Sequence, residues 1–366
     1  MAMYSSDPRP YGILPSRGMS LPCNCHQIYI DDMITNPNVK INLGLNILRK
    51  REDGFHDLET LFVPYFDIHD TLEIVSGDDY SRTSASLFSR YGDAALPASQ
   101  GSMKPEGVFG VEVSDSEAPK IVQGMSEDGR LMITIARKEG VDWDPLKDLC
   151  AKAYMMLAAD FDLPPVKIFL EKTSPVGAGL GGGSSDAAFT LKMLNEMFSL
   201  GLSEGRLAGY ASRLGSDCAF FIYNRPMIGE GRGEILTDYS LEGCLDFARH
   251  DNEGAGYVNE EIRCDEGCSG SGKEPFEIQV ITPAGISVST AEAYGGIVPE
   301  LPEMSLRQVL ELPVEQWDGL LVNDFEETVF AKYPELAAIK RSLYDSGAVY
   351  ASMSGSGSAL FAIYRK

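Results

Sequence analysis

The sequence predicts an α+β protein with two domains, and three observations support this prediction. The chain has 366 residues, enough for two ordinary domains with sizeable cores. In its first part, an apolar strand-like run leads through a glycine-rich loop into an amphipathic helix. In its last part, a strand, a helix and two more strands follow in series, which is typical of an α+β half with an antiparallel sheet.

The composition is that of a soluble globular protein and restricts the partners that the chain can bind. Hydrophobic residues make up 44% and charged residues 23%, both ordinary fractions. No apolar stretch reaches the roughly 18 residues of a membrane helix, and no charged-then-apolar export signal opens the chain. The formal net charge of −23 repels nucleic acid and anionic membranes. We therefore expect neither as a partner, and an anionic ligand must be held by a few local donors.

The first elements of the chain alternate strands with irregular segments. Residues 1–32 contain four prolines and no periodicity, which indicates a disordered extension or a mis-assigned start. Strand patterns follow at Asn38 to Leu48 and at Thr71 to Val75. Residues 76–130 are rich in Ser, Gly and Asp, so we expect a surface insertion with room for a hairpin. A helix is predicted from Leu149 to Ala159.

The glycine-rich loop is the most informative feature of the sequence. An apolar strand, 166–170, precedes it, and a helix without Gly or Pro is predicted from Ser184 to Leu200. Glycines let the backbone approach a ligand closely, and a helix N-terminus adds unpaired N–H groups and partial positive charge. The loop therefore predicts a phosphate cradle. Its residues are Pro175, Val176, Gly177, Ala178, Gly179, Leu180, Gly181, Gly182, Gly183, Ser184 and Ser185.

Three other interpretations of this loop are weaker. Gly177, Gly179 and Gly182 have the spacing of a dinucleotide fingerprint, but the expected acidic ribose ligand is missing, since Glu204 lies inside the next predicted helix. A P-loop would need a lysine after the glycines, and there is none. A flexible Gly-Ser linker would seldom end in an amphipathic helix with two hydroxyl residues in its first turn.

The remaining elements lead to the C-terminal half. Ser203 is a good N-cap for a helix that Gly215 ends. Residues 242–274 form a second predicted insertion, which marks the domain boundary. A strand at Glu277–Ile281 and a helix at Pro334–Asp345 follow. Two last strands flank the turn Ser354-Gly355-Ser356-Gly357-Ser358, which on its own is an ordinary hairpin loop.

Three segments hold residues that suit catalysis, although each also has a structural explanation. Asp217 follows Gly215 and could be a base for a hydroxyl proton or a simple turn aspartate. Lys40 and Asn42 share one strand face, which could be the solvent face of a half-buried strand. In Phe55-His56, an aromatic ring and an imidazole could stack on and hydrogen-bond a pyrimidine, or could be core and loop residues.

Together with the glycine-rich loop, these segments resemble the GHMP kinases. The further matching segments, in family order, are 37–43 with 51–62, then 214–222, then 323–326 with 353–358. The resemblance implies a ribosomal protein S5 domain 2-like N-terminal domain at 33–241, which binds ATP, and a ferredoxin-like C-terminal GHMP domain at 275–366. The active cleft would lie between them.

The resemblance also implies roles for single residues. Lys40 and Asp217 correspond to the catalytic pair, which transfers the ATP γ-phosphoryl group directly to a hydroxyl, and the glycine-rich loop binds ATP. Phe55 departs from the Tyr-His pair that is usual in the family, so a hydrogen bond from that tyrosine would be lost. The predicted substrate-binding residues are Asn42, Phe55, His56, Ser289, Thr290, Gly355, Ser356 and Gly357.

The expected ligands follow from the same resemblance. ATP should come with Mg²⁺, for which Ser184, Ser185 and Asp217 are the candidate oxygen ligands. The Asp-Gly-Phe-His element is similar to members that phosphorylate a cytidine-diphosphate alcohol of non-mevalonate isoprenoid biosynthesis. Alternatives are a homoserine or mevalonate type of kinase, or a nucleotide-binding module without activity. We expect a cytoplasmic protein, a monomer or a weak homodimer, whose seven cysteines are mostly free thiols.

Overall fold

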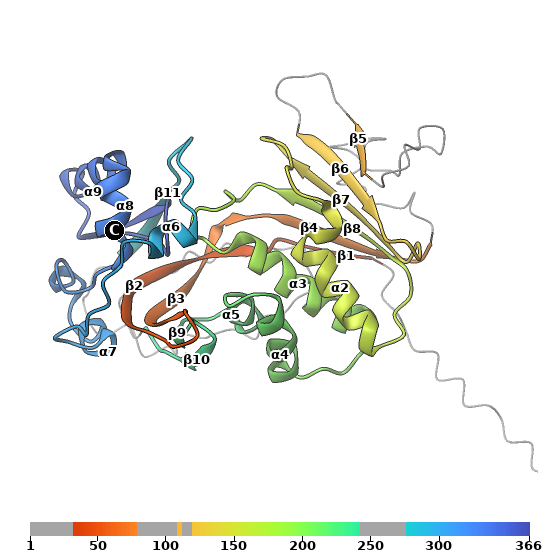
Figure 1. The fold of residues 1–366 in the computed structure, drawn as a ribbon, viewed down its shortest axis with the longest axis horizontal. Helices are drawn as coiled ribbons and strands as arrows, with labels where there is room; N and C mark the ends of the chain where they lie inside the picture. The colour runs from red at the N-terminus through yellow and green to blue at the C-terminus, as the bar shows by residue number, and fades with distance from the viewer. Residues whose placement is uncertain (1–31, 79–107, 112–118, 242–275) are drawn as a thin grey trace, which may run out of the picture.

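The computed structural model describes residues 32–78, 108–111, 119–241 and 276–366. The predicted extension, apart from residue 32, and the predicted insertion at 242–274 lie outside the described residues. Figure 1 shows a large sheet with helices at one end of the molecule, a smaller C-terminal part at the other, and long strands joining them.

The large sheet has six strands in the order β1-β4-β8-β7-β6-β5. Every neighbouring pair is antiparallel except β7 and β8, which run parallel. The strands are β1 (Asp32–Thr35), β4 (Thr71–Ser76), β5 (Val108–Val111), β6 (Lys120–Met125), β7 (Leu131–Arg137) and β8 (Val166–Lys172). The described part of the predicted insertion 76–130 therefore contains the hairpin β5–β6, and β6 extends the sheet at β7.

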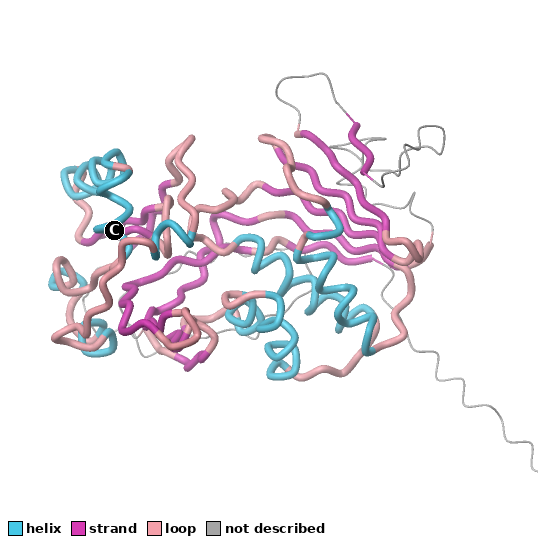
Figure 2. The backbone as a smooth tube through the Cα atoms, viewed as in Figure 1, coloured by secondary structure: helices cyan, strands magenta, loops and turns pink. Residues whose placement is uncertain are grey.

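Four helices cover one face of this sheet, as Figures 1 and 2 show. They are α2 (Leu149–Asp160), α3 (Gly182–Met197), α4 (Glu204–Leu214) and α5 (Cys218–Tyr223), with a 3-10 turn η2 (Pro145–Lys147) before α2. The core between helices and sheet includes Leu72, Ile133 and Ile168 from the strands and Leu191 and Phe220 from the helices. This packing fixes the N-terminus of α3 at the end of β8.

A second sheet connects the two ends of the molecule. Its order is β10-β9-β3-β2, with β2 (Asn38–Lys50), β3 (His56–His69), β9 (Met227–Gly231) and β10 (Ile235–Asp238). The C-terminal part has a three-stranded sheet in the order β11-β13-β12. Its elements are β11 (Phe276–Ile281), α6 (Thr290–Tyr294), α7 (Leu306–Leu310), η4 (Val314–Gln316), α8 (Phe325–Lys332), α9 (Pro334–Asp345), β12 (Tyr350–Met353) and β13 (Leu360–Arg365).

The strand β2 is buried on both faces. Val39 and Ile41 point into a core that also contains Trp317 and Phe361 from the C-terminal part. On the other face Lys40 is only 3% exposed, so this face is not the solvent face of a half-buried strand. A buried lysine needs partners, because burying an unpaired charge is costly. Its position therefore points to a functional or structural site beneath it.

The predicted elements in the described residues are confirmed, with shifts at their ends. Ser203 caps α4 by accepting a hydrogen bond from the backbone N–H of Arg206, and Gly215 ends that helix. The helix α3 begins at Gly182, two residues before the predicted start, and ends at Met197 rather than at residue 200. Ser199 adopts a left-handed φ of 49°, which takes the chain out of the helix.

Candidate active site

A cavity of about 520 Å³ lies where the glycine-rich loop, β2, the start of α5 and the C-terminal part meet. Lys40 and Asn42 reach it from β2, and Asp217 reaches it from the turn before α5. Thr290, Gly355 and Ser356 line it from the C-terminal part. The cavity thus brings together residues from five of the predicted site segments.

The glycine-rich loop presses against the second glycine turn, 354–358. Gly179 has a φ of 76°, and a Cβ there would lie 2.2 Å from the backbone oxygen of Ser354. The Ala359 N–H donates to the oxygen of Ala178 over 3.1 Å, and the Lys40 N–H donates to the oxygen of Leu180 over 3.0 Å. Only glycine fits this contact, which holds the start of α3 open toward the cavity.

Lys40 and Asp217 face each other at the centre of the cavity. The Lys40 Nζ lies 3.5 Å from Asp217 Oδ2 and donates to Asn42 Oδ1 over 2.5 Å and to the Gly179 oxygen over 2.9 Å. Burial lowers the pKa of Lys40, and the Asp217 carboxylate opposes this effect. The Asp217 side chain is 30% exposed, so it can meet a substrate.

Asn42 is held by the protein at both ends of its side-chain amide. Its Oδ1 accepts from Lys40, its Nδ2 donates to Thr60 Oγ1 over 3.0 Å, and its backbone N–H donates to Ser354 Oγ over 3.2 Å. Its side chain therefore orients the Lys40 ammonium. Asn323 supports the same region, because its Nδ2 donates to the backbone oxygens of Met353 and Gly355.

The other end of the cavity carries aromatic and cationic groups. Tyr294 lines it, and the ring of His56 stacks on Tyr294 with centroids 4.8 Å apart and an interplanar angle of 19°. Burial lowers the pKa of His56, with a further contribution from Lys50. Neutral His56 can donate and accept hydrogen bonds, which suits the edge of a nucleobase. Of this pair, Tyr294 lines the cavity and His56 lies behind it.

Comparisons with known proteins agree with this geometry. The model of the GHMP kinases N terminal domain matches residues 148–225, and that of the GHMP kinases C terminal matches residues 298–366. The 4-diphosphocytidyl-2-C-methyl-D-erythritol kinase of Bacteroides thetaiotaomicron is 40% identical over 91% of this chain and 92% of its own length. The enzyme of the same name from Bacteroides fragilis is 37% identical over the same fractions.

The chain belongs to the GHMP kinase family. Its fold is similar to a crystal structure of 4-(cytidine 5'-diphospho)-2C-methyl-D-erythritol kinase, with a TM-score of 0.56 and 24% identity over 90% of this chain and 89% of that one. The mevalonate kinase of Methanococcus jannaschii has a TM-score of 0.50 at 12% identity, over 91% of this chain and 90% of that one. The predicted α+β GHMP kinase fold is confirmed, and the family uses ATP as its phosphate donor.

Sequence reasoning about this GHMP kinase missed a buried ionic network under the glycine-rich loop. Lys172, at the end of β8, donates to Asp70 Oδ2 over 2.5 Å and to Asp186 Oδ2 over 2.6 Å. Asp70 also accepts the backbone N–H groups of Thr173 and Ser174, both over 2.7 Å. Asp186 could have indicated this network. It lies four residues before Thr190, so both share one side of α3, and that side is buried.

Tyr294 and Arg232 were also missed, because Tyr294 lies in the short helix α6 and Arg232 in the turn after β9, and neither segment has a motif. Tyr294 is one turn beyond the predicted Ser289-Thr290 pair. Arg232 follows β9 and lines the cavity, with its guanidinium 4.9 Å from the centroid of the exposed Phe55 ring. Phe55 and His56 reach the cavity through these two neighbours and are not themselves on its lining.

A few other predicted residues lie behind the cavity wall. The Ser289 hydroxyl caps α6 by accepting a hydrogen bond from the Glu292 N–H. Thr290, in contrast, lines the cavity, and its hydroxyl oxygen lies 3.4 Å from that of Ser356. Leu180, Ser185 and Gly357 are not among the lining residues. The Ser185 hydroxyl is buried and has no hydrogen-bond partner in the described part of the chain.

The described residues contain no group of three or more His, Cys, Asp or Glu side chains that could hold a metal ion by itself. Among the helices described, none is both long and apolar enough to cross a membrane. Cys150 and Cys218 are free and buried, and the other five cysteines lie outside the described residues.

Proposed function

We propose that this protein transfers the γ-phosphoryl group of ATP to the 2-hydroxyl of 4-diphosphocytidyl-2-C-methyl-D-erythritol. The observation that carries the proposal is the Lys40–Asp217 pair between two unlike ends of one cavity. One end is the glycine-rich loop, which suits phosphate, and the other is the His56–Tyr294 stack, which suits a pyrimidine. The relatives that align with 91% of the chain, at 37% and 40% identity, carry this substrate in their names.

The donor end would hold the triphosphate by its backbone. The N-terminus of α3 begins at Gly182, and its first N–H groups and partial positive charge favour an anion. Lys40 adds a full positive charge next to the loop, because its Nζ is already hydrogen-bonded to the Gly179 oxygen. In a chain of net charge −23, such local donors are what make ATP binding possible.

The transfer itself needs a base and a cation at the same point. Asp217 accepts the proton of the attacking hydroxyl, the hydroxyl oxygen forms a bond to the γ-phosphorus, and the bond from that phosphorus to the β–γ bridging oxygen breaks to release ADP. Lys40 stabilises the negative charge that develops on the transferred group. Asn42 holds the Lys40 ammonium in place. No phosphorylated enzyme is formed.

The donor side also suits Mg²⁺, which prefers a few hard oxygen ligands in addition to phosphate and water. Asp217 and Ser184 both line the cavity and would be its protein ligands. The third candidate, Ser185, lies behind the wall, so it fits less well. When bound, the ion would neutralise charge on the triphosphate.

Two substitutions test this proposal. Lys40→Met and Asp217→Asn should each lower kcat by about 10²–10⁴-fold, because each removes one charge that acts in the transition state. Circular dichroism should show that both variants fold. ADP formation should be measured with the cytidine-diphosphate alcohol, mevalonate and homoserine side by side. Activity with mevalonate or homoserine alone would contradict the substrate assignment, and near-full activity of both variants would contradict the catalytic pair.

A further inference from the structure

Two hairpin turns meet at the acceptor end of the cavity. The turn between β2 and β3 carries Phe55, and the turn between β9 and β10 carries Arg232. Because β3 and β9 pair antiparallel, with Leu58 opposite Gly231, both turns lie at the same end of the sheet. The Arg232 guanidinium lies over the Phe55 ring at 4.9 Å from its centroid, within cation–π range.

Arg232 differs from the other two cations on the cavity lining, Lys40 and Lys172. Both lysines are buried and held by oxygen atoms of the protein. The Arg232 side chain is 46% exposed, and its Nε lies 3.5 Å from Glu234 Oε1, a weak surface ion pair. Within the described residues, the guanidinium makes no hydrogen bond, so its donors can bind a ligand.

The two carboxylates near Arg232, Glu234 and Asp53, also hold the backbone of the two turns. Glu234 accepts the backbone N–H of Arg232 over 2.6 Å, which closes the β9–β10 turn. Asp53 pairs with Arg51 over 2.9 Å and accepts the Phe55 N–H over 3.1 Å. These contacts rigidify the two turns and leave the guanidinium with the weak Glu234 ion pair and the nearby charge of Asp53 as its only opposite charges in the described residues.

We propose that Arg232 is the specificity-determining residue for the diphosphate of the acceptor. This rests on the proposed function. A guanidinium donates two parallel hydrogen bonds to phosphate oxygens, and an aromatic ring beneath it keeps its plane in position. Phe55 then serves as the platform for Arg232. The site selects acceptors that carry phosphate next to a pyrimidine.

The test compares two ligands that differ only in the diphosphate. CDP and cytidine are titrated calorimetrically into the wild type, Arg232→Met and Arg232→Lys, with the ATP site saturated by a non-hydrolysable ATP analogue. In Arg232→Met, CDP affinity should fall about 10–100-fold, which corresponds to the loss of charged hydrogen bonds, while cytidine affinity should stay within about twofold. Arg232→Lys should restore part of the CDP affinity, because lysine keeps the positive charge but cannot donate two parallel hydrogen bonds to the phosphate.

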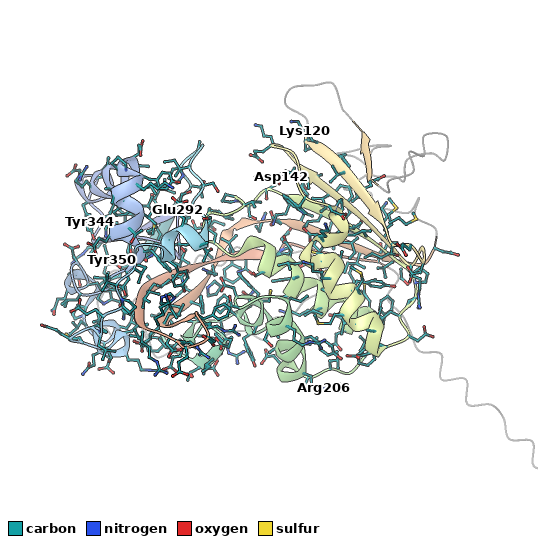
Figure 3. The ribbon with its side chains drawn as sticks, viewed as in Figure 1. Lys120, Asp142, Arg206, Glu292, Tyr344 and Tyr350 are labelled. Atoms are coloured by element: carbon teal, nitrogen blue, oxygen red, sulfur yellow. The ribbon has the colours of Figure 1, made fainter. Side chains whose placement is uncertain are left out.

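Kinetics and a matched control complete the test. In Arg232→Met, KM for the cytidine-diphosphate alcohol should rise, while kcat and KM for ATP stay unchanged. Arg206→Met removes the same charge from α4, where Figure 3 shows Arg206 on the outer side of the molecule, and should change none of these values.

Three outcomes would overturn the inference, and they differ from failure of the proposed function. An equal loss of CDP and cytidine affinity would mean that Arg232 acts on the nucleoside. Unchanged CDP affinity would mean that it does not bind the acceptor, and a lower kcat with unchanged KM would place it in the chemistry. If the wild type bound neither ligand, both the proposed function and this inference would be wrong.

Discussion

Lys40 shows how one residue combines a functional need with an energetic cost. The strand β2 places its ammonium where only 3% of the residue is exposed, so burial lowers its pKa despite the nearby Asp217. The strand alternation also allowed Lys40 to lie on the solvent face of a half-buried strand, where its ammonium would be hydrated. The alternation fixed which face Lys40 is on, but it could not show that the C-terminal part covers that face.

The Lys40 shift predicts opposite pH trends for activity and stability. In the proposed mechanism the rate needs the protonated lysine, so kcat should fall on the alkaline side at a pH below the ordinary value of 10.5. Across the same range the unfolded chain binds the extra proton, so this group's contribution to the free energy of unfolding rises with pH. The measurements are kcat–pH profiles and urea unfolding of the wild type and Lys40→Met, whose difference in unfolding free energy isolates the lysine. A difference that is flat with pH would contradict the lowered pKa.

For Asp186 the dependence of stability on pH should have the opposite sign to that for Lys40. Burial raises the pKa of Asp186, and the neighbouring Asp70 carboxyl, which shares the Lys172 ammonium, adds to this effect. The folded state then binds more protons than the unfolded one, and stability falls as pH rises above the ordinary value of 3.8. Between the pKa values of Asp186 in the unfolded and folded states, the slope is about 1.4 kcal/mol of unfolding free energy per pH unit. In Asp186→Asn this slope should vanish. Thermal unfolding against pH checks it, with the exposed Asp162→Asn as control.

At the scale of elements, the active site depends on two glycine turns that the sequence placed correctly but could not bring together. The local pattern of apolar residues and glycines predicted both the strand–loop–helix series at 166–197 and the hairpin turn at 354–358. Their mutual contact, and the contacts of Arg232 with Phe55 and of Lys172 with Asp70, join segments far apart in the chain. Local periodicity carries no information on such pairs, so these residues were missed.

The contact between the two turns predicts that Gly179→Ala is damaging. Its new Cβ would meet the Ser354 oxygen at 2.2 Å, and the φ of 76° is strained for alanine. The variant should lose about 1–3 kcal/mol of unfolding free energy and bind ATP more weakly, because the two turns must separate. Gly209→Ala, inside α4 with no atom within 4 Å of the new Cβ, should instead gain about 1 kcal/mol. Similar unfolding midpoints for the two variants would show that the turns are not in close contact.

At the scale of the whole molecule, the long strands β2 and β3 belong to both halves. Their apolar side chains Val39, Ile41 and Leu61 lie in one core with Trp317 and Tyr350 of the C-terminal part. The N-terminal part therefore has one core of its own, between its helices and the large sheet, and shares a second core with the C-terminal part. Figure 1 shows β2 and β3 extending from the large sheet to the C-terminal end. The cavity lies at this junction, so catalysis requires that the two halves stay together.

This shared core predicts that the protein unfolds in one step. The chain has two tryptophans, Trp143 in the N-terminal part and the buried Trp317 in the shared core. In Trp143→Phe, fluorescence then reports on the shared core alone, while far-UV circular dichroism follows mainly the helices on the large sheet. Because exposing β2 would leave its buried apolar side chains in water, at about 25 cal/mol per Å², neither half can unfold alone at low cost. The two urea transitions should coincide. Separate transitions would show that the two halves fold independently and that β2 tolerates the loss of its C-terminal partner.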